Sequence, residues 1–463
     1  MNFLIYIAAF LLPLDNFPIM FGGAYKPVSL VFIALFFAVN FHHVLRMKYK
    51  KAEICIGMIV IGAIIVTAFQ NISLHYSFLG LKDAASSLAA GLVIYLSFKI
   101  FVAQNGQRDS YVKLFKWMLR GYGIALAVGV LQIVYMYISS SGVISSFIGL
   151  FIERKAYIQA HRLQFTFSEP SYIGLHTNLF IFPAYLVLKH TNNLSRYDRM
   201  IVLLFIPMSI LSLSIRYFLD LVILYLVYTF VTSRSKEFVN LCLKLGAAVG
   251  IGLLLIHVVL VNNVFNLDSS HYYRILHIYN DPDKLMKDDS FSIRATYSKI
   301  GWHAFLDKPI LGYGVGNYHY GYINHLDKIP PKDFKDGSEL SDATNQLSLP
   351  QYNMYTRLLS EFGLMGIALF LLCGFLLLSA KGRNFSTMII LLLVFALLQF
   401  DSFAFIQLVF WIALLQSKFI SELVVLKLPG SAVAARQEVG GSRLVRPNVG
   451  LPLRTTTILG EKL

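Results

Sequence analysis

Charged residues are scarce in this sequence. Only 14% of the 463 residues are Asp, Glu, Lys or Arg, whereas 56% are hydrophobic, and the mean hydropathy is +0.63. Soluble domains carry about 25% charged residues, so the composition excludes an ordinary water-soluble protein. Apolar runs of about 18 to 25 residues recur along most of the chain, and each is long enough to cross a bilayer as a helix. The sequence therefore predicts an all-α integral membrane protein.

Cysteines and metal-binding motifs are also rare. The three cysteines, Cys55, Cys242 and Cys373, lie in apolar runs rather than in loops, which indicates neither a disulfide framework nor a cysteine metal site. The acidic residues form no cluster of the kind that holds Mg²⁺ between phosphates, and the histidines lack the paired spacing of a metal site. We therefore expect no metal and no other cofactor.

The pattern of a cleavable leader and that of internal repeats are not seen in the sequence either. Residues 1–14 are apolar but lack the basic start and the small-residue cleavage site of a secretory signal, so we interpret them as the beginning of the first membrane helix. No segment is repeated along the chain, whereas many secondary transporters contain inverted repeats. This is a weak argument against a transporter.

Twelve apolar segments are predicted to cross the membrane. Their approximate ranges are 1–20, 27–45, 53–70, 84–103, 118–138, 171–188, 200–215, 217–233, 239–262, 354–379, 386–401 and 403–424. The chain then divides into 1–262 with helices one to nine, a large outer loop over 263–352, helices ten to twelve over 353–424, and a flexible tail over 425–463. A connection as long as this loop is usually functional or disordered.

Positive charge gives the expected orientation. The formal net charge is +15, and no basic patch interleaved with aromatic residues points to nucleic acid. Lys and Arg gather in the loops after the second, fourth and sixth predicted helices, as Arg46, Lys48, Lys50, Lys51, Arg108, Lys113, Lys116, Lys189, Arg196 and Arg199. Short loops of this kind stay in the cytoplasm. We therefore expect a multi-pass protein of a bacterial inner membrane, with both termini cytoplasmic and the long loop periplasmic.

Three arginines from separate segments are expected at the outer face. Arg162 precedes the sixth predicted helix, Arg216 lies at the turn between the seventh and eighth, and Arg294 lies in an amphipathic stretch of the long loop. An arginine near lipid is costly and usually serves a site or a partner. Asp220 could pair with Arg216 one helical turn on, and a purely structural pair stays open. Because the planar guanidinium suits phosphate oxygens, convergent arginines here predict a diphosphate on a lipid carrier.

A transfer reaction at such a site also needs a base for the attacking hydroxyl. Glu169, just before the sixth helix, is the first candidate, and a role as a helix cap is its structural alternative. Glu361 and His303 are further candidates. His176 is interpreted as a packed, hydrogen-bonded histidine.

A series of loose motifs follows in order between about 160 and 370. They are 162–174 with Arg162 and Gly174, Ser214-Ile215-Arg216, Arg294 followed by 308–317, Asn353-Met354-Tyr355, and 359–366 with Glu361. In this order, and with twelve helices and one long outer loop, the sequence resembles the O-antigen polymerase and O-antigen ligase superfamily. The resemblance implies a GT-C-like helical fold and metal-independent transfer of a glycan from undecaprenyl diphosphate at the outer leaflet.

With this resemblance, catalytic roles are expected for Glu169, Arg216 and Arg294. The expected substrate-binding residues are Arg162, Trp302, His303, Tyr313, Asn353 and Glu361. The expected partners are undecaprenyl-diphosphate-linked glycans and membrane lipids, and a chain-length regulator and a flippase are further candidates.

The motifs do not choose by themselves between polymerase and ligase. Ligases of the superfamily carry a functional histidine in the long loop or just before the tenth helix, where this chain reads Gln351-Tyr352-Asn353. This departure favours a polymerase of O-antigen or capsular repeat units, although His319 or His325 could substitute in a ligase. The interval from Arg162 to Gly174 is also one residue longer than in some polymerases. The alternative from another class is a lipid-linked oligosaccharide flippase or exporter, which should place its charges at the midplane rather than at outer helix ends.

Overall fold

The structure of the protein is a computed structural model with helices as its only regular secondary structure in the described residues. These residues are 2–18, 27–232, 261–263, 270–281, 283–284, 289–328, 349–379 and 384–423, with single positions between 243 and 258. The all-α prediction therefore agrees with the described part of the chain. The predicted ninth helix, 239–262, lies mostly outside it, and the tail 425–463 lies entirely outside it.

The helices fall into three stretches of the chain. The first contains α1 (Phe3–Phe10), α2 (Ser29–Val39), α3 (Phe41–Val44), α4 (Lys51–Leu74), α5 (Phe78–Gln104), α6 (Arg108–Tyr137), α7 (Gly142–Ile148) and α8 (Ala156–Gln159). The second contains α9 (Tyr172–His176), the π-helical η1 (Thr177–Ile181), α10 (Phe182–His190), α11 (Arg196–Met208), the 3₁₀-helical η2 (Ser209–Ser212) and α12 (Ile215–Thr232). The third contains α14 (Ser270–Asn280), α15 (Asp289–Asp307), α16 (Tyr318–His325), η5 (Leu326–Lys328), α18 (Met354–Phe362), α19 (Leu364–Ser379), α20 (Asn384–Leu397), α21 (Ile406–Leu414) and α22 (Lys418–Ser421).

Several of these helices have the length and composition of membrane spans. Among the described residues, α4, α5, α6 and α12 are long and apolar enough to cross a bilayer, and α2, α19 and α20 are shorter apolar helices. Large apolar side chains such as Ile61, Phe69 and Phe230 are more than half exposed on these helices. Hydrocarbon is the solvent that such surfaces require, so the protein is an integral membrane protein.

The segment 1–20 is not one helix, contrary to the prediction. α1 ends at Phe10, and the chain continues through turns to Asp15 and Asn16. Pro13 lacks the N–H group that would continue a helical hydrogen-bond ladder. The buried Asp15 carboxylate instead accepts the backbone N–H of Ser168 at 2.6 Å. A tertiary contact thus ends the helix inside an otherwise apolar run.

The segment 354–379 is also divided, into α18 and α19. Gly363 separates them with a φ of +60°. A Cβ at this position would lie 2.6 Å from the carbonyl oxygens of Pro309 and Ile310, so glycine is required for the turn at 308–312 to pack here. The prediction of a single span was wrong. The strongly apolar sequence of α19 dominated the hydrophobicity of the segment, although α18 is amphipathic.

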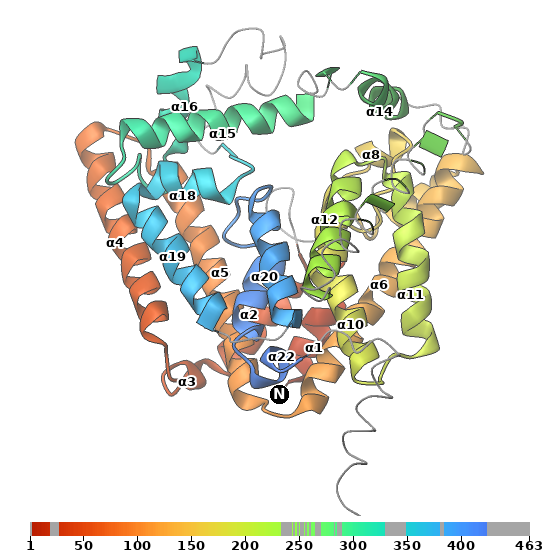
Figure 1. Cartoon of the computed structure of the whole chain (residues 1–463). Helices are drawn as coiled ribbons and strands as arrows, with labels where there is room; N and C mark the ends of the chain where they lie inside the picture. Colours follow the sequence, from red (N-terminus) through yellow and green to blue (C-terminus); the bar gives the residue numbers. More distant parts are fainter. Residues whose placement is uncertain are drawn as a thin grey trace, which may run out of the picture. The chain divides into compact units, whose positions relative to one another are not determined.

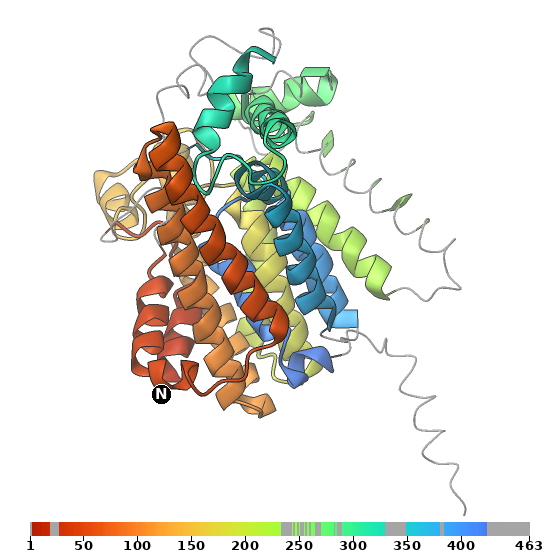
Figure 2. The same cartoon turned by 90° about the vertical axis from the view of Figure 1, so that its left-hand side faces the viewer.

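Contacts between loops define one end of the helix bundle. Gln104 donates to the side-chain oxygen of Asn40 at 3.2 Å, and Arg108 donates to the carbonyl of Thr191 at 2.7 Å. The loops rich in Lys and Arg therefore share one end, as their alternation predicts. This is the end that carries the N label (Figure 1, Figure 2).

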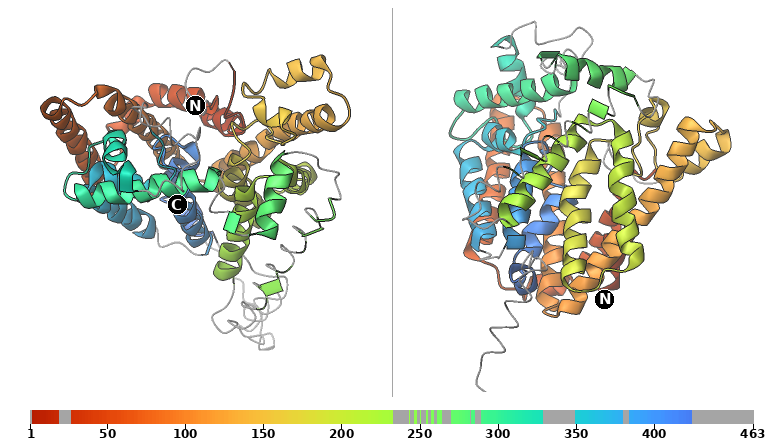
Figure 3. Two further views of the ribbon diagram at one scale, coloured as in Figure 1. Left: turned by 90° about the horizontal axis from the view of Figure 1, so that it is seen from above. Right: turned by 45° about the vertical axis from the view of Figure 1, so that its right-hand side comes forward.

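The described part of the predicted outer loop is mostly helical and lies at the opposite end. α15 runs across this end and packs against α16 and α18 (Figure 1, Figure 3). The turn after α4 packs against α16, because the rings of Tyr76 and Tyr320 stack with their centroids 3.6 Å apart. The core under α15 consists of Tyr297, Ile300, Tyr318 and Tyr322. This aromatic core explains how the described part of the loop is folded despite the polar composition of the loop.

Candidate active site

A cavity of about 520 Å³ lies at the α15 end of the bundle. Its walls come from the loop between α8 and α9, the beginning of α12, α14, α15, Tyr352 and the residues after α20. The ionisable lining residues are Tyr157, Arg162, Glu169, Arg216, Arg274, Arg294 and Tyr352. Four arginines and one carboxylate from distant parts of the sequence thus share one cavity.

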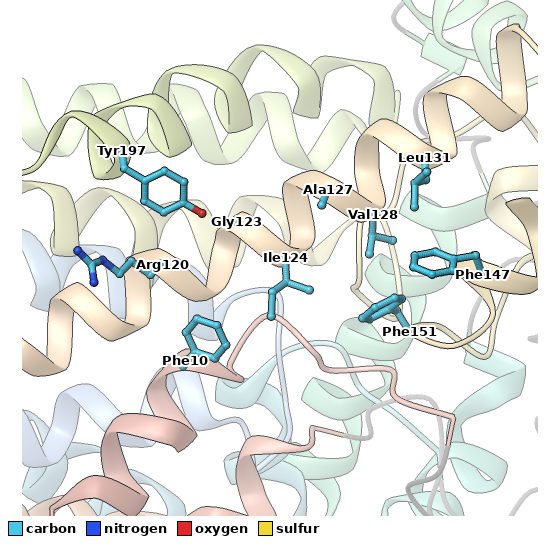
Figure 4. A pocket seen from close by; sticks show the side chains of 10 residues that line it. All are labelled: Phe10, Arg120, Gly123, Ile124, Ala127, Val128, Leu131, Phe147, Phe151 and Tyr197. Carbon is cyan, nitrogen blue, oxygen red and sulfur yellow. The ribbon is translucent and has the colours of Figure 1, made fainter.

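A second hollow, of about 750 Å³, runs along α6 and is mainly apolar. Figure 4 shows Arg120 toward one end of it, with Phe147 and Phe151 toward the other. Arg120 is the one charged residue of its lining and already pairs with Asp198 at 3.4 Å. Such walls suit hydrocarbon, whereas the arginine-lined cavity suits anionic reactants. We therefore place the candidate chemistry in the arginine-lined cavity.

Arg216 lies in the first turn of α12 and lines the cavity. Its guanidinium carbon is 3.8 Å from the centroid of the Phe400 ring, and its Nε is 3.6 Å from a carboxylate oxygen of Asp220. The side chain is only 10% exposed. The predicted pair with Asp220 is therefore present, and the guanidinium also lies over an aromatic ring.

Gly174 explains how Asp220 reaches that position. A Cβ at 174 would overlap the carboxylate of Asp220, so α12 can approach α9 only because residue 174 is glycine. Asn178, in the π-helical turn η1, donates to the Asp220 carbonyl at 2.9 Å. The motif that contains Gly174 thus supports Arg216 through the packing of two helices.

Arg162 is held by the neighbouring backbone. Its Nε donates to the carbonyl of Ser212 at 3.0 Å, and its guanidinium lies 5.5 Å from the ring of Tyr157. Burial lowers the pKa of the Arg162 guanidinium to about 10, and the nearby Arg274 acts in the same direction. Arg162 therefore stays charged at neutral pH, in surroundings where an anion would be stabilising.

Arg294 and Arg274 reach the cavity from α15 and α14. The guanidinium carbon of Arg294 is 5.1 Å from the ring centroid of Tyr352. Each of the three predicted arginines therefore lies over an aromatic ring. Stacking of this kind orients the donor fork of an arginine before a ligand arrives.

Glu169 contributes the carboxylate of the lining. Its side chain is 30% exposed and lies 3.9 Å from Arg154, and it accepts the hydroxyl of Ser171 at 2.9 Å. The N-cap of α9 is Ser171, which makes no side-chain cap hydrogen bond. The carboxylate therefore faces the cavity and Ser171. It does not cap the helix, which was the structural alternative.

Buried amide groups hold the loop that carries Arg162 and Glu169. Gln132 of α6 accepts the N–H groups of Gln164 at 3.2 Å and Phe165 at 3.0 Å, and donates to the carbonyl of Phe165. The loop is thereby fixed to the transmembrane bundle, which orients both of its charged side chains.

Trp302, His303 and Tyr313 lie outside the lining of the cavity. Trp302 is about half exposed on α15, and the His303 ring lies 6.3 Å from that of His325. The Tyr313 hydroxyl donates to Asp307 at 2.7 Å, and burial, together with this hydrogen bond, raises its pKa. Trp302 and His303 belong to α15, and Tyr313 lies in the turn between α15 and α16.

Asn353 and Glu361 also have partners outside the cavity. The Asn353 side-chain oxygen caps α18 by accepting the N–H of Tyr355 at 3.0 Å. Glu361 pairs with Arg357 at 3.0 Å and accepts the N–H of Gly316 at 2.9 Å. Glu361 thus ties the glycine-rich turn 312–316 to α18, and Glu169 is the candidate base that lines the cavity.

Two further lining residues have weak signals in the sequence. Arg274 and Arg294 are the two arginines within 263–352, a feature that could have drawn attention to Arg274. Tyr352 adjoins Asn353 but belongs to no charged motif. Its role as a platform for Arg294 becomes visible only when 352 and α15 are brought together.

Residues 200–371, which contain Arg216, Arg274, Arg294 and Tyr352, match the sequence model of a family described as O-antigen ligase. This match is consistent with the O-antigen polymerase and ligase superfamily that the sequence motifs resemble. The superfamily comprises glycosyl-transferring enzymes, both polymerases and ligases. A search of curated proteins found no match. Arg162 and Glu169 precede the matched segment, so their part in the cavity rests on the structure.

Proposed function

We propose that this protein polymerises undecaprenyl-diphosphate-linked oligosaccharide repeat units into O-antigen or capsular polysaccharide. One observation carries the proposal: four arginines and Glu169 line a single cavity at the end of a membrane-embedded helix bundle. A lipid diphosphate is an anion that can enter such a cavity while its lipid chain stays in the bilayer. Its oxygens match the donor forks of the arginines.

In this mechanism Arg216 and Arg294 bind the diphosphate of the lipid that carries the growing glycan. The bond between the anomeric carbon and the diphosphate oxygen breaks, and negative charge develops on the departing undecaprenyl diphosphate. Arginines already oriented by Phe400 and Tyr352 would stabilise this charge without reorganising. The donor set of the cavity favours anion binding over coordination of Mg²⁺.

Glu169 accepts the proton of the attacking hydroxyl. This hydroxyl belongs to the terminal sugar of a second lipid-linked repeat unit, and its oxygen forms the new bond to the anomeric carbon. Arg154 lies 3.9 Å from the Glu169 carboxylate and helps to hold it beside the cavity. Arg162 binds one of the two lipids beside it.

Tyr352 supports a polymerase over a ligase. It occupies the region where the resemblance expects the functional histidine of a ligase, and it lines the cavity beneath Arg294. The substitutes His319 and His325 are buried in α16 and do not contribute to the lining. Ligation to lipid A core remains the second candidate because the matched family is described as O-antigen ligase.

The reaction would take place on the periplasmic side of a bacterial inner membrane. The loops rich in Lys and Arg share the opposite end of the bundle, and such loops stay in the cytoplasm. Undecaprenyl-linked glycans, a flippase that delivers them and a chain-length regulator would be the partners at this membrane.

A strain carrying Arg294→Ala tests the proposal against transport. We expect lipid-linked single repeat units to accumulate in the outer leaflet, since loss of the arginine blocks polymerisation after translocation. Accessibility of the units to an added periplasmic glycosidase measures the leaflet. Units trapped in the inner leaflet would instead indicate a flippase.

A further inference from the structure

Asp15 is a buried acid that the proposed mechanism does not use. It follows α1 in the broken first segment, far from the residues 200–371 that match the family. Its side chain is 0% exposed. A carboxylate removed from water is costly unless its oxygens are held, so the partners of Asp15 indicate what it does.

The first partner is the loop that carries Glu169. One oxygen of Asp15 accepts the backbone N–H of Ser168 at 2.6 Å. The carbonyl of Pro13 accepts the hydroxyl of Thr166 at 2.6 Å. Both contacts lie within three residues of Glu169, and the residue held by Asp15 is its immediate neighbour. The first segment therefore fastens the loop just before the candidate base.

A second, weaker contact, without a hydrogen bond, joins Asp15 to His176 at the end of α9. Its Nε2 is 3.4 Å from the other oxygen of Asp15, and both side chains are 0% exposed. The Tyr122 hydroxyl and the Gln407 amide hold the imidazole at 2.7 and 2.9 Å. Asp15 thus hydrogen-bonds to the chain before Glu169 and packs against the helix after it.

We propose that Asp15, supported by His176, is a positioning residue for Glu169. In this arrangement the N-terminal segment completes an active site whose arginines lie mostly in the matched domain. The inference rests on the proposed role of Glu169 as the base. Asp15 itself is too deeply buried to contact a sugar, so it acts through the backbone of Ser168.

Two substitutions at Asp15 distinguish a positioning role from a general loss of structure. Asp15→Ala removes the acceptor for Ser168, and a displacement of the base by about 1 Å can cost about 100-fold in rate. We expect a loss in kcat of this order with the KM for lipid-linked repeat units unchanged. Asp15→Asn keeps an oxygen that can accept the same N–H and should retain most of the activity.

Asp198→Ala is the matched control. Like Asp15, Asp198 is an acid whose side chain is 0% exposed. It pairs with Arg120 and lies at the opposite end of the bundle. Its loss should leave kcat largely unchanged at equal thermal stability of the purified proteins. If Asp15→Ala does not give folded protein, Asp15→Ser replaces it, since serine is too short to reach Ser168.

A double substitution decides whether Asp15 acts through Glu169. Once Glu169→Gln has removed the base, adding Asp15→Ala should reduce kcat little further. Losses that multiply would overturn the positioning role and leave the proposed function standing. Full activity of Glu169→Gln alone would overturn the base itself, and the inference with it. Equal losses in Asp15→Asn and Asp15→Ala would also contradict positioning by the hydrogen bond.

Discussion

Arg216 lies between a ring and a carboxylate that together fix its donor fork. Phe400 is at 3.8 Å and Asp220 at 3.6 Å. A lysine at this position would keep the positive charge but would lose the planar fork and the stacked geometry. A substitution at position 216 therefore tests whether the site needs only a positive charge or also the planar geometry of arginine.

We predict that Arg216→Lys lowers the polymerisation rate about 100-fold, the scale seen when one oriented donor to a developing charge is lost. The measurement is the initial rate of glycan elongation by purified protein in liposomes. Arg120→Lys, in the apolar groove along α6, is the control and should have little effect. A rate near that of the unsubstituted protein for Arg216→Lys would mean that charge alone suffices.

The residue scale also shows the limits of prediction from sequence. Arg162, Glu169, Arg216 and Arg294 could be singled out because a charged residue beside an apolar run is conspicuous, and the structure gathers all four at one cavity. Their catalytic and binding roles stay predictions. Asp15 escaped notice because a single acid inside an apolar run gives no pattern, and its importance depends on a contact with Ser168 from far along the chain.

At the scale of helices, the approach of α9 to α12 links two motifs that are separate in the sequence. Gly174 makes room for Asp220, and Asp220 pairs with Arg216. The sequence motif includes Gly174, but only the packing of the two helices explains why a glycine is needed there.

We predict that Gly174→Ala lowers activity by pushing α12 away from α9 and moving Arg216. Gly62→Ala is a matched control, because residue 62 also lies in a helix and a Cβ there meets open space. In α4 the alanine should be neutral or stabilising by up to about 1 kcal/mol. The comparison uses melting temperature and elongation rate together. Normal activity of Gly174→Ala would show that the close approach is not needed.

The boundaries of helices were the least predictable part of the fold. Hydrophobic length located the long helices α4, α5 and α6, since a continuous apolar run has few alternatives in a bilayer. It failed at 1–20 and 354–379. There Pro13 contacts Thr166, and Gly363 packs against the turn at 308–312. No local pattern can reveal such tertiary contacts.

At the scale of the whole molecule, alternation of charge and the arrangement of the loops agree. The basic loops share one end of the bundle, and the cavity lies at the other. If the positive-inside rule holds for this protein, the cavity end faces the periplasm.

Cysteine labelling tests this orientation. Ser140, just after α6, and Lys48, just before α4, are both exposed and lie at opposite ends of the bundle. We predict that Ser140→Cys reacts with a membrane-impermeant maleimide in intact cells, whereas Lys48→Cys reacts only after permeabilisation. The unsubstituted protein gives the background from its own cysteines. The reverse pattern would place the cavity in the cytoplasm and rule out the proposed reaction.

The central claim is that this protein joins lipid-linked repeat units by itself. The most direct measurement incubates purified protein in liposomes with undecaprenyl-diphosphate-linked repeat units and a chelator, and then separates the products by length on a gel. We predict a ladder of polymers that is lost in Arg216→Ala. No ladder, but transfer of glycan once lipid A core is added, would contradict polymerisation and identify a ligase.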